Sequence, residues 1–148
     1  MIEPCYAATV LHQAFAAPVT RGVSQTRYTP IGCGTRWNGD YATESDSNFT
    51  WRSAGTLSNL YTNVNANTIT AASTLRTRKG TADANLVVSI TASTTGKFED
   101  TSNSDVVTAG DNWHISFTAG GTGTSIIMRT YSLLFSATTN TVSRVGCD

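Results

Sequence analysis

The sequence predicts an all-β protein, a jelly-roll-like antiparallel β-sandwich with an irregular N-terminal arm. The first observation is that residues 52–135 contain short segments in which apolar and polar residues alternate with the period of a β-strand. The second is that clusters of Gly, Asn, Asp and Ser, which favour turns, separate these segments. The third is composition: charged residues are only 14% of the 148 residues, and the uncharged, β-branched Thr suits half-exposed pleated faces.

The predicted strands downstream of residue 52 each have an apolar side. In one of them, Leu75 and Thr77 oppose Arg76 and Arg78 across the strand. The alternating segments are 60–64, 74–78, 86–92, 113–118 and 126–135. Each apolar side needs a facing sheet to cover it, so two packed sheets of about eight strands are the economical arrangement.

The last of these segments, residues 126–135, is apolar on both sides of a regular strand. Ile126, Met128 and Leu134 lie on one side, and Ile127, Tyr131, Leu133 and Phe135 lie on the other. Antiparallel sandwich strands normally keep one solvated face. We therefore expect a second protein surface to cover this strand, most simply a copy related by a threefold axis in a homotrimer.

Two regions are expected: residues 1–51 form an extended N-terminal arm with the first short strands, and residues 52–148 form the β-sandwich module. The first region holds all three prolines of the chain and several glycines, which interrupt long regular elements. Short strands are predicted around Arg21–Tyr28 and Asn48–Trp51. A helix over Ala7–Ala17 is an alternative, because its apolar residues keep helical spacing.

Ten basic and ten acidic residues give a formal net charge of zero, which predicts no nucleic-acid partner and no anionic membrane surface. No apolar run approaches the roughly 20 residues of a membrane-spanning helix. The opening residues lack the basic and apolar regions of a signal peptide and are expected to be mature protein.

Cys5, Cys33 and Cys147 lack metal-type spacing, so three reduced thiols or one Cys5–Cys33 disulfide are the alternatives.

Two glycine positions have a predicted structural role. Gly55 begins a strand beside an apolar stretch, where we expect a bulge or a close approach of another backbone. The glycine-rich residues Gly120–Gly123 lie between two apolar strands and predict a flexible hairpin loop. A phosphate-binding loop would need a helix after it, whereas a strand is predicted there.

Catalytic chemistry is not predicted. His12 lies in the irregular region, and His114 lies on a predicted strand without a Ser or Cys in a nucleophile-elbow context. Glycosidases use a pair of carboxyl groups, and the candidate pairs are Glu44 with Asp46 and Asp100 with Asp105. Ordinary loop acids are the commoner use of such residues, so we expect no enzyme activity and no cofactor.

A metal site is not predicted either, although acidic residues gather in one stretch of the sequence. Calcium prefers hard oxygen ligands of this kind, and the acids are Glu99, Asp100, Asp105 and Asp111. Solvated turn acids and strand-end caps are the commoner role. Arg76 and Arg78 are expected to be solvated or to pair with Glu99 or Asp100.

Four short motifs resemble a pattern found in virion proteins of tailed bacteriophages. They are RSAGTLSNLY at residues 52–61, TLRTRKG at 74–80, GKFEDT at 96–101 and AGD at 109–111. The resemblance is to jelly-roll modules of capsid exteriors and tail appendages, which are commonly trimers. It covers about the last two thirds of the chain, and the first fifty residues match no motif.

The resemblance implies a non-enzymatic virion structural protein, most simply a capsid decoration or cement protein that binds the outside of the capsid and stabilises the shell. Its expected partners are the major capsid protein and further copies of itself in a homotrimer. The alternative is a tail-fibre or receptor-binding module that recognises host surface glycans. Aromatic side chains are the expected partner-binding residues because they anchor interfaces and stack on sugars. They are Tyr6, Phe15, Tyr28, Trp37 and Tyr41.

Overall fold

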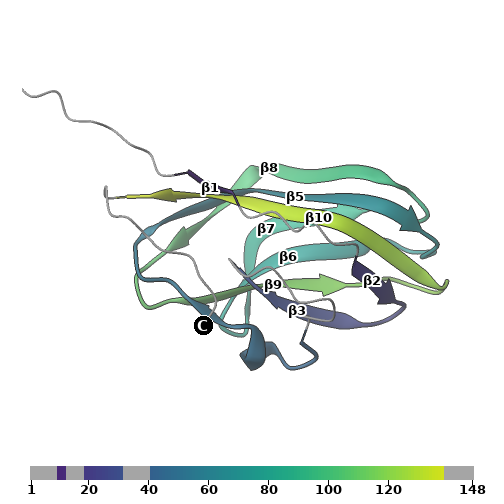
Figure 1. Cartoon of the computed structure of the whole chain (residues 1–148), viewed down its shortest axis with the longest axis horizontal. Helices are drawn as coiled ribbons and strands as arrows, with labels where there is room; N and C mark the ends of the chain where they lie inside the picture. Colours follow the sequence, from purple (N-terminus) through teal and green to yellow (C-terminus); the bar gives the residue numbers. More distant parts are fainter. Residues whose placement is uncertain (1–9, 13–18, 32–40, 139–148) are drawn as a thin grey trace, which may run out of the picture.

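The computed structural model describes residues 10–12, 19–31 and 41–138, which form two antiparallel β-sheets packed face to face (Figure 1). Sheet A contains β1 (Val10–His12), β2 (Val19–Gly22), β5 (Gly55–Asn67), β8 (Gly96–Val107) and β10 (Ser125–Ala137). Sheet B contains β3 (Thr26–Pro30), β4 (Phe49–Thr50), β6 (Ser73–Lys79), β7 (Ala82–Ile90) and β9 (Asn112–Thr118). A short 3-10 helix, η1 (Glu44–Ser47), precedes β4. The predicted all-β sandwich is confirmed.

The order of strands within the sheets is that of a jelly roll. Sheet A has the order β1-β10-β5-β8, with β2 also paired to β10, and sheet B has the order β3-β9-β6-β7, with β4 also paired to β9. The strands β6 and β7 form a hairpin within sheet B, and from β7 onward the chain changes sheet at every connection. Strands distant in sequence therefore become neighbours, as Figure 1 shows for β10 between β5 and β2.

The hydrophobic core lies between the sheets and consists of the inward side of each strand. The alternation predicted for residues 60–64, 74–78 and 86–90 is confirmed, because every second residue in these segments is buried. The largest fully buried apolar side chains come from both sheets and the loops between them: Trp51, Leu57, Leu60, Ile69, Leu75, Leu86, Ile90, Ile115, Ile126 and Met128.

Strand β10 does not have the two apolar faces that its sequence predicts. Its ladder with β5 is shifted between Met128 and Thr130, which marks a β-bulge. An extra residue reverses the alternation of a strand, so the buried side chains are Ile126, Met128, Tyr131, Leu133 and Phe135. Ile127 and Leu134 on the other side are half-buried. The prediction of two apolar faces was wrong, and the homotrimer stays a prediction without this argument.

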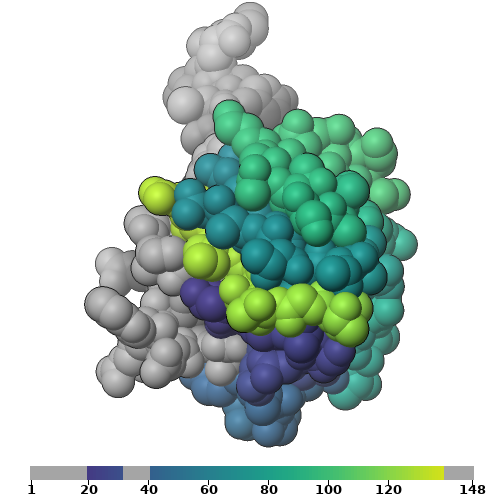
Figure 2. All heavy atoms as spheres, turned by 90° about the vertical axis from the view of Figure 1, so that its right-hand side faces the viewer, coloured from purple at the N-terminus to yellow at the C-terminus, as the bar shows by residue number. Residues whose placement is uncertain are grey.

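The predicted hairpin at Gly120–Gly123 was also wrong, because β9 belongs to sheet B and β10 to sheet A. The loop instead crosses between the sheets and packs on the residues that follow β5, at the end of the sandwich that faces the viewer in Figure 2. Thr70 donates its backbone N–H to Thr122 O at 2.8 Å, and Gly120 donates its N–H to Ser73 Oγ at 3.1 Å. These bonds fix the loop against its neighbour.

The described strands of the N-terminal region belong to the two sheets. The strands β1 and β2 pair with β10, whereas β3 and β4 pair with β9. The short strands predicted around Arg21–Tyr28 and Asn48–Trp51 correspond to β2 with β3 and to β4. Residues Val10–His12 form β1, so the alternative of a helix over Ala7–Ala17 is wrong at these positions. Cys5, Cys33 and Cys147 lie outside the described residues.

Candidate functional site

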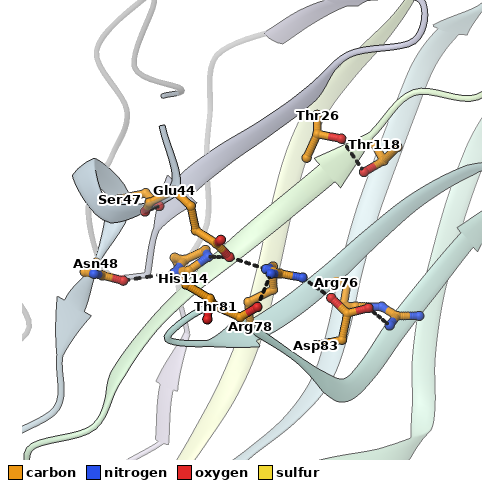
Figure 3. Close-up of polar contacts among 10 residues, drawn as sticks. All are labelled: Thr26, Glu44, Ser47, Asn48, Arg76, Arg78, Thr81, Asp83, His114 and Thr118. Atoms are coloured by element: carbon orange, nitrogen blue, oxygen red, sulfur yellow. Dashed lines mark hydrogen bonds and ion pairs between the residues drawn. The ribbon is translucent and has the colours of Figure 1, made fainter. Parts of the chain in front are cut away.

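The outward side of β9 is covered, which is unusual for a sandwich strand. Ile115 and Phe117 face the core as predicted, but His114 and Ser116 on the opposite side are buried as well. The residues Tyr41–Asn48, which we call the strap, lie over this side of sheet B and include η1 (Figure 3). The strap thereby creates a second buried layer outside the main core.

Glu44 of the strap is the centre of a charged network (Figure 3). Its Oε1 atom accepts a hydrogen bond from His114 Nε2 at 2.9 Å and one from Nε of Arg78. Arg78 lies directly opposite His114 in the ladder between β6 and β9, and it also forms an ion pair with Asp83. Arg76 forms a second ion pair with Asp83. We call Glu44, Arg76, Arg78, Asp83 and His114 the charged network.

The partners of the two arginines differ from those that the sequence predicts. Glu44 and Asp83, and not Glu99 or Asp100, pair with Arg76 and Arg78. Asp83 follows from the β6–β7 hairpin, whose ladder places it opposite Arg78, and a hairpin register is a signal that sequence reasoning could have used. Glu44 reaches Arg78 only because the strap folds back over sheet B.

The network holds His114 neutral and Glu44 ionised at neutral pH. Burial lowers the pKa of His114, and the hydrogen bond with Glu44 offsets this only in part. Burial raises the pKa of Glu44, but hydrogen bonds from Arg78 and His114 outweigh burial and hold that pKa below its ordinary value. A neutral imidazole has one N–H, which therefore lies on Nε2 and donates to Glu44. Its Nδ1 lies 3.2 Å from Asn48 Oδ1, where the amide can donate after a half-turn rotation.

Two of the predicted partner-binding residues, Tyr28 and Tyr41, are neighbours at the edge of this site. Their backbones form a β-bridge in which Tyr28 N–H donates to Tyr41 O at 3.0 Å and Tyr41 N–H donates to Tyr28 O at 2.8 Å. The Tyr28 ring is half-buried and meets the His114 ring edge-on, with 5.5 Å between centroids. The Tyr41 side chain is 40% exposed, so it is the one available to a partner. Tyr6, Phe15 and Trp37 lie outside the described residues.

Two of the acids considered as calcium ligands join the edges of the two sheets instead. Asp105 of β8 accepts hydrogen bonds from the backbone N–H groups of Asn85 at 2.7 Å and Leu86 at 3.2 Å, and from the Thr77 hydroxyl. Asp100 of β8 accepts the N–H of Val87 at 2.9 Å. We call Asp100 and Asp105 the edge clasp. The strand β7 lies at the edge of sheet B, and the two carboxylates accept hydrogen bonds from its backbone N–H groups in place of a further strand.

The remaining acids of that stretch have separate structural roles. Asp111 pairs with Lys79 at 2.7 Å and accepts the Thr108 N–H at 2.8 Å. The Lys79 contact is the largest cause that lowers the pKa of Asp111. Glu99 is exposed on β8. Within the described residues, no group of three or more His, Cys, Asp or Glu side chains is placed to hold a metal ion.

The geometry also shows how the candidate acid–base groups are used. Glu44 is held by His114 and Arg78, whereas the exposed Asp46 accepts a hydrogen bond from Ser45 at 3.4 Å. Asp100 and Asp105 both point at backbone N–H groups of β7. The two carboxyl groups of each candidate pair therefore have different partners. Glu44 holds the strap on sheet B, and Asp100 and Asp105 hold β8 to β7.

By its fold and this site, the protein is a jelly-roll sandwich with the strap over sheet B and the edge clasp between β7 and β8. No protein-family model matches the sequence, and no curated protein matches it. Among the described residues, no helix has the length and apolar character needed to cross a membrane.

Proposed function

We propose that this chain is a non-enzymatic structural protein of a tailed-bacteriophage virion, a capsid decoration protein that binds the outside of the capsid and stabilises the shell. The observation that supports this most is the use of the buried and half-buried ionisable groups. Glu44, His114, Asp100 and Asp105 all hold parts of the fold together, which leaves the surface as the working part of the molecule. The four sequence motifs resemble modules of phage virion proteins, and this resemblance is the reason for proposing a virion as the assembly.

A decoration protein stabilises a shell by burying surface against more than one capsid subunit, so that each subunit helps to hold its neighbour. In this proposal the partner is the major capsid protein, and the decoration protein binds it as a homotrimer. Tyr41 is the described aromatic side chain best exposed for such a contact. A net charge of zero also means that copies repel each other little when they crowd on a shell.

The proposal is tested by counting copies of the protein in purified virions by quantitative mass spectrometry. A copy number comparable to that of the major capsid protein is expected. Only a handful of copies per particle would exclude a decoration role. Adding the purified protein back to particles that lack it should raise the temperature at which the shells open, and light scattering of the free protein should give the mass of a trimer.

A second candidate function is a tail-fibre or receptor-binding module for host glycans. It is favoured by one observation, the exposed Tyr41 ring beside Tyr28 at the edge of the strap, since aromatic rings stack on sugars. The variant Tyr41→Ser separates the two functions. Lower adsorption to host cells with unchanged occupancy on the virion would support the receptor role, and lower occupancy with unchanged adsorption would support the decoration role.

A further inference from the structure

His114 is a titratable side chain buried inside a set of charges that is already balanced. Its side chain has 0% exposed surface. Glu44 contacts it from the strap, and Arg78 lies beside it on β6. Asp83 on β7 and Arg76 on β6 continue the network. The two carboxylates and two guanidinium groups sum to zero charge, so a proton on His114 would add an unbalanced positive charge in a buried position.

The other groups packed against His114 do not compensate such a charge. Tyr28 on β3 presents a ring edge, and Asn48 at the end of the strap presents its Oδ1 atom to Nδ1 at 3.2 Å, an oxygen that can accept a hydrogen bond but carries no net charge. The Glu44 oxygen that faces His114 is the same Oε1 that Arg78 already contacts. The remaining acid of the strap, Asp46, is exposed and bonded to Ser45. Water would solvate the imidazolium only if the strap were lifted from sheet B.

We propose that the strap is a pH-sensitive cover: protonation of His114 favours its release from the outer side of sheet B. The inference goes beyond the virion role and does not depend on it. Release breaks the Tyr28–Tyr41 bridge and the contacts of Glu44, whereas β4 stays paired with β9 through Phe49 and Thr50. The strap therefore opens about its C-terminal end and uncovers His114 and the Tyr28 ring.

Lower pH favours opening of the strap, because protonation of His114 and opening are thermodynamically linked. The pKa of His114 is lower with the strap closed than in solvent. The closed state therefore has its full stability relative to the open state above about pH 6.5, and it loses stability as the pH falls below that value. The pKa of Glu44 is also lowered in the closed state, and this adds an effect of the same sign at still lower pH. At pH 5.5 the opening constant rises by up to about tenfold from His114 alone.

Hydrogen exchange of the full chain at pH 7.5 and pH 5.5, corrected for intrinsic exchange rates, tests the proposal. The reporters are the amides of Tyr28 and Tyr41. Each donates a hydrogen bond to the carbonyl oxygen of the other residue and so joins β3 to the strap. The controls are the amides of Leu60 and Tyr131 on the central strands of sheet A. Protection of the reporters is expected to fall up to about tenfold at the lower pH, while protection of the controls is unchanged.

The variant His114→Gln keeps a polar side chain of similar length and cannot titrate, so the pH dependence of the reporters should disappear. Because this variant can fail to fold, an NMR titration of the His114 ring in the unaltered chain serves as a second measurement. A ring that titrates at or above the value of a solvated histidine would overturn the proposal. Equal loss of protection in reporters and controls, or reporters that do not change with pH, would overturn it as well.

Discussion

At the scale of single residues, Gly55 shows how closely two strands of sheet A approach. A Cβ atom at this position would lie 2.4 Å from Phe135 Cε2 and 2.5 Å from Ser136 O. No side chain fits there unless β5 and β10 move apart. Gly22 differs, because the nearest atom to its Cβ position is 3.8 Å away, on the Gln25 side chain. The expectation of a close backbone approach at Gly55 is confirmed.

We predict that Gly55→Ala destabilises the fold by about 1–3 kcal/mol, the usual cost of overpacking a core. The measurement is urea-induced unfolding followed by tryptophan fluorescence. Gly22→Ala is the matched control, because its added methyl group meets only ordinary contacts, and it should leave the midpoint nearly unchanged. Equal midpoints for the two variants would contradict the close approach.

At the scale of elements, the two edge strands β7 and β8 are joined by side chains. A backbone ladder between them is replaced by the edge clasp, in which carboxylates of β8 accept N–H groups of β7. Asp105 is only 2% exposed, so its three bonds are shielded from water, and the two backbone donors, Asn85 and Leu86, would otherwise be left unsatisfied. The clasp closes one side of the sandwich against pairing with another chain.

The variant Asp105→Asn should destabilise the protein by about 1–3 kcal/mol. Its amide NH₂ group would replace one acceptor oxygen of Asp105, so a backbone N–H of β7 would face a second donor and lose its hydrogen bond. Chemical denaturation at pH 7 measures this change. Glu99→Gln, an exposed substitution on the same strand, provides the control and should change stability little. A variant Asp105→Asn as stable as the control would show that the clasp does not hold the edges together.

Asp100 should make stability depend on pH in acid. Burial raises its pKa, but hydrogen bonds from Val87, Asn103 and Ser102 outweigh burial and lower the pKa overall. The stabilisation is therefore fully present above about pH 3.9 and is lost as the pH falls below that value. Urea unfolding between pH 5 and pH 2.5 should show a smaller acid-induced loss of stability for Asp100→Asn than for the unaltered chain. Parallel pH profiles would contradict this prediction.

At the scale of the whole molecule, the N-terminal strands cover the outer edge of β10. The strand β1 pairs with Leu134–Ser136 and β2 pairs with Ser125–Met128. The long strands β5, β8 and β10 pair among themselves and carry most of sheet A. The N-terminal region therefore adds to a sandwich whose main core comes from later residues.

Deleting residues 1–19 should leave a folded β-sandwich while attachment to the capsid falls sharply. The far-ultraviolet circular dichroism spectrum should change little, because β1 has only three residues and β2 loses only its first. Occupancy is measured by binding the truncated protein to undecorated particles, with the full chain as the reference. Full occupancy by a folded truncated protein would show that the N-terminal arm is not the attachment point.

The alternation of single strands could be predicted from sequence, because the side chains of a strand point to opposite faces with a period of two. The apolar sides at residues 60–64, 74–78 and 86–90 followed from that rule. The bulge near Met128 could not be predicted, since an extra residue in a ladder depends on the pairing of β10 with β5. The same holds for Gly120–Gly123, whose path depends on which sheet each neighbouring strand joins.

The amino-acid sequence by itself determined the all-β fold class, because composition, turn residues and strand periodicity are local properties. Tertiary structure alone decided how Glu44, His114 and Asp105 are used. Glu44 meets His114 across 70 positions of sequence, and Asp105 meets Asn85 across 20. Such contacts depend on how the strap and the sheet edges come together in space. Local propensity carries no information about a partner that only the folded chain brings within hydrogen-bonding distance.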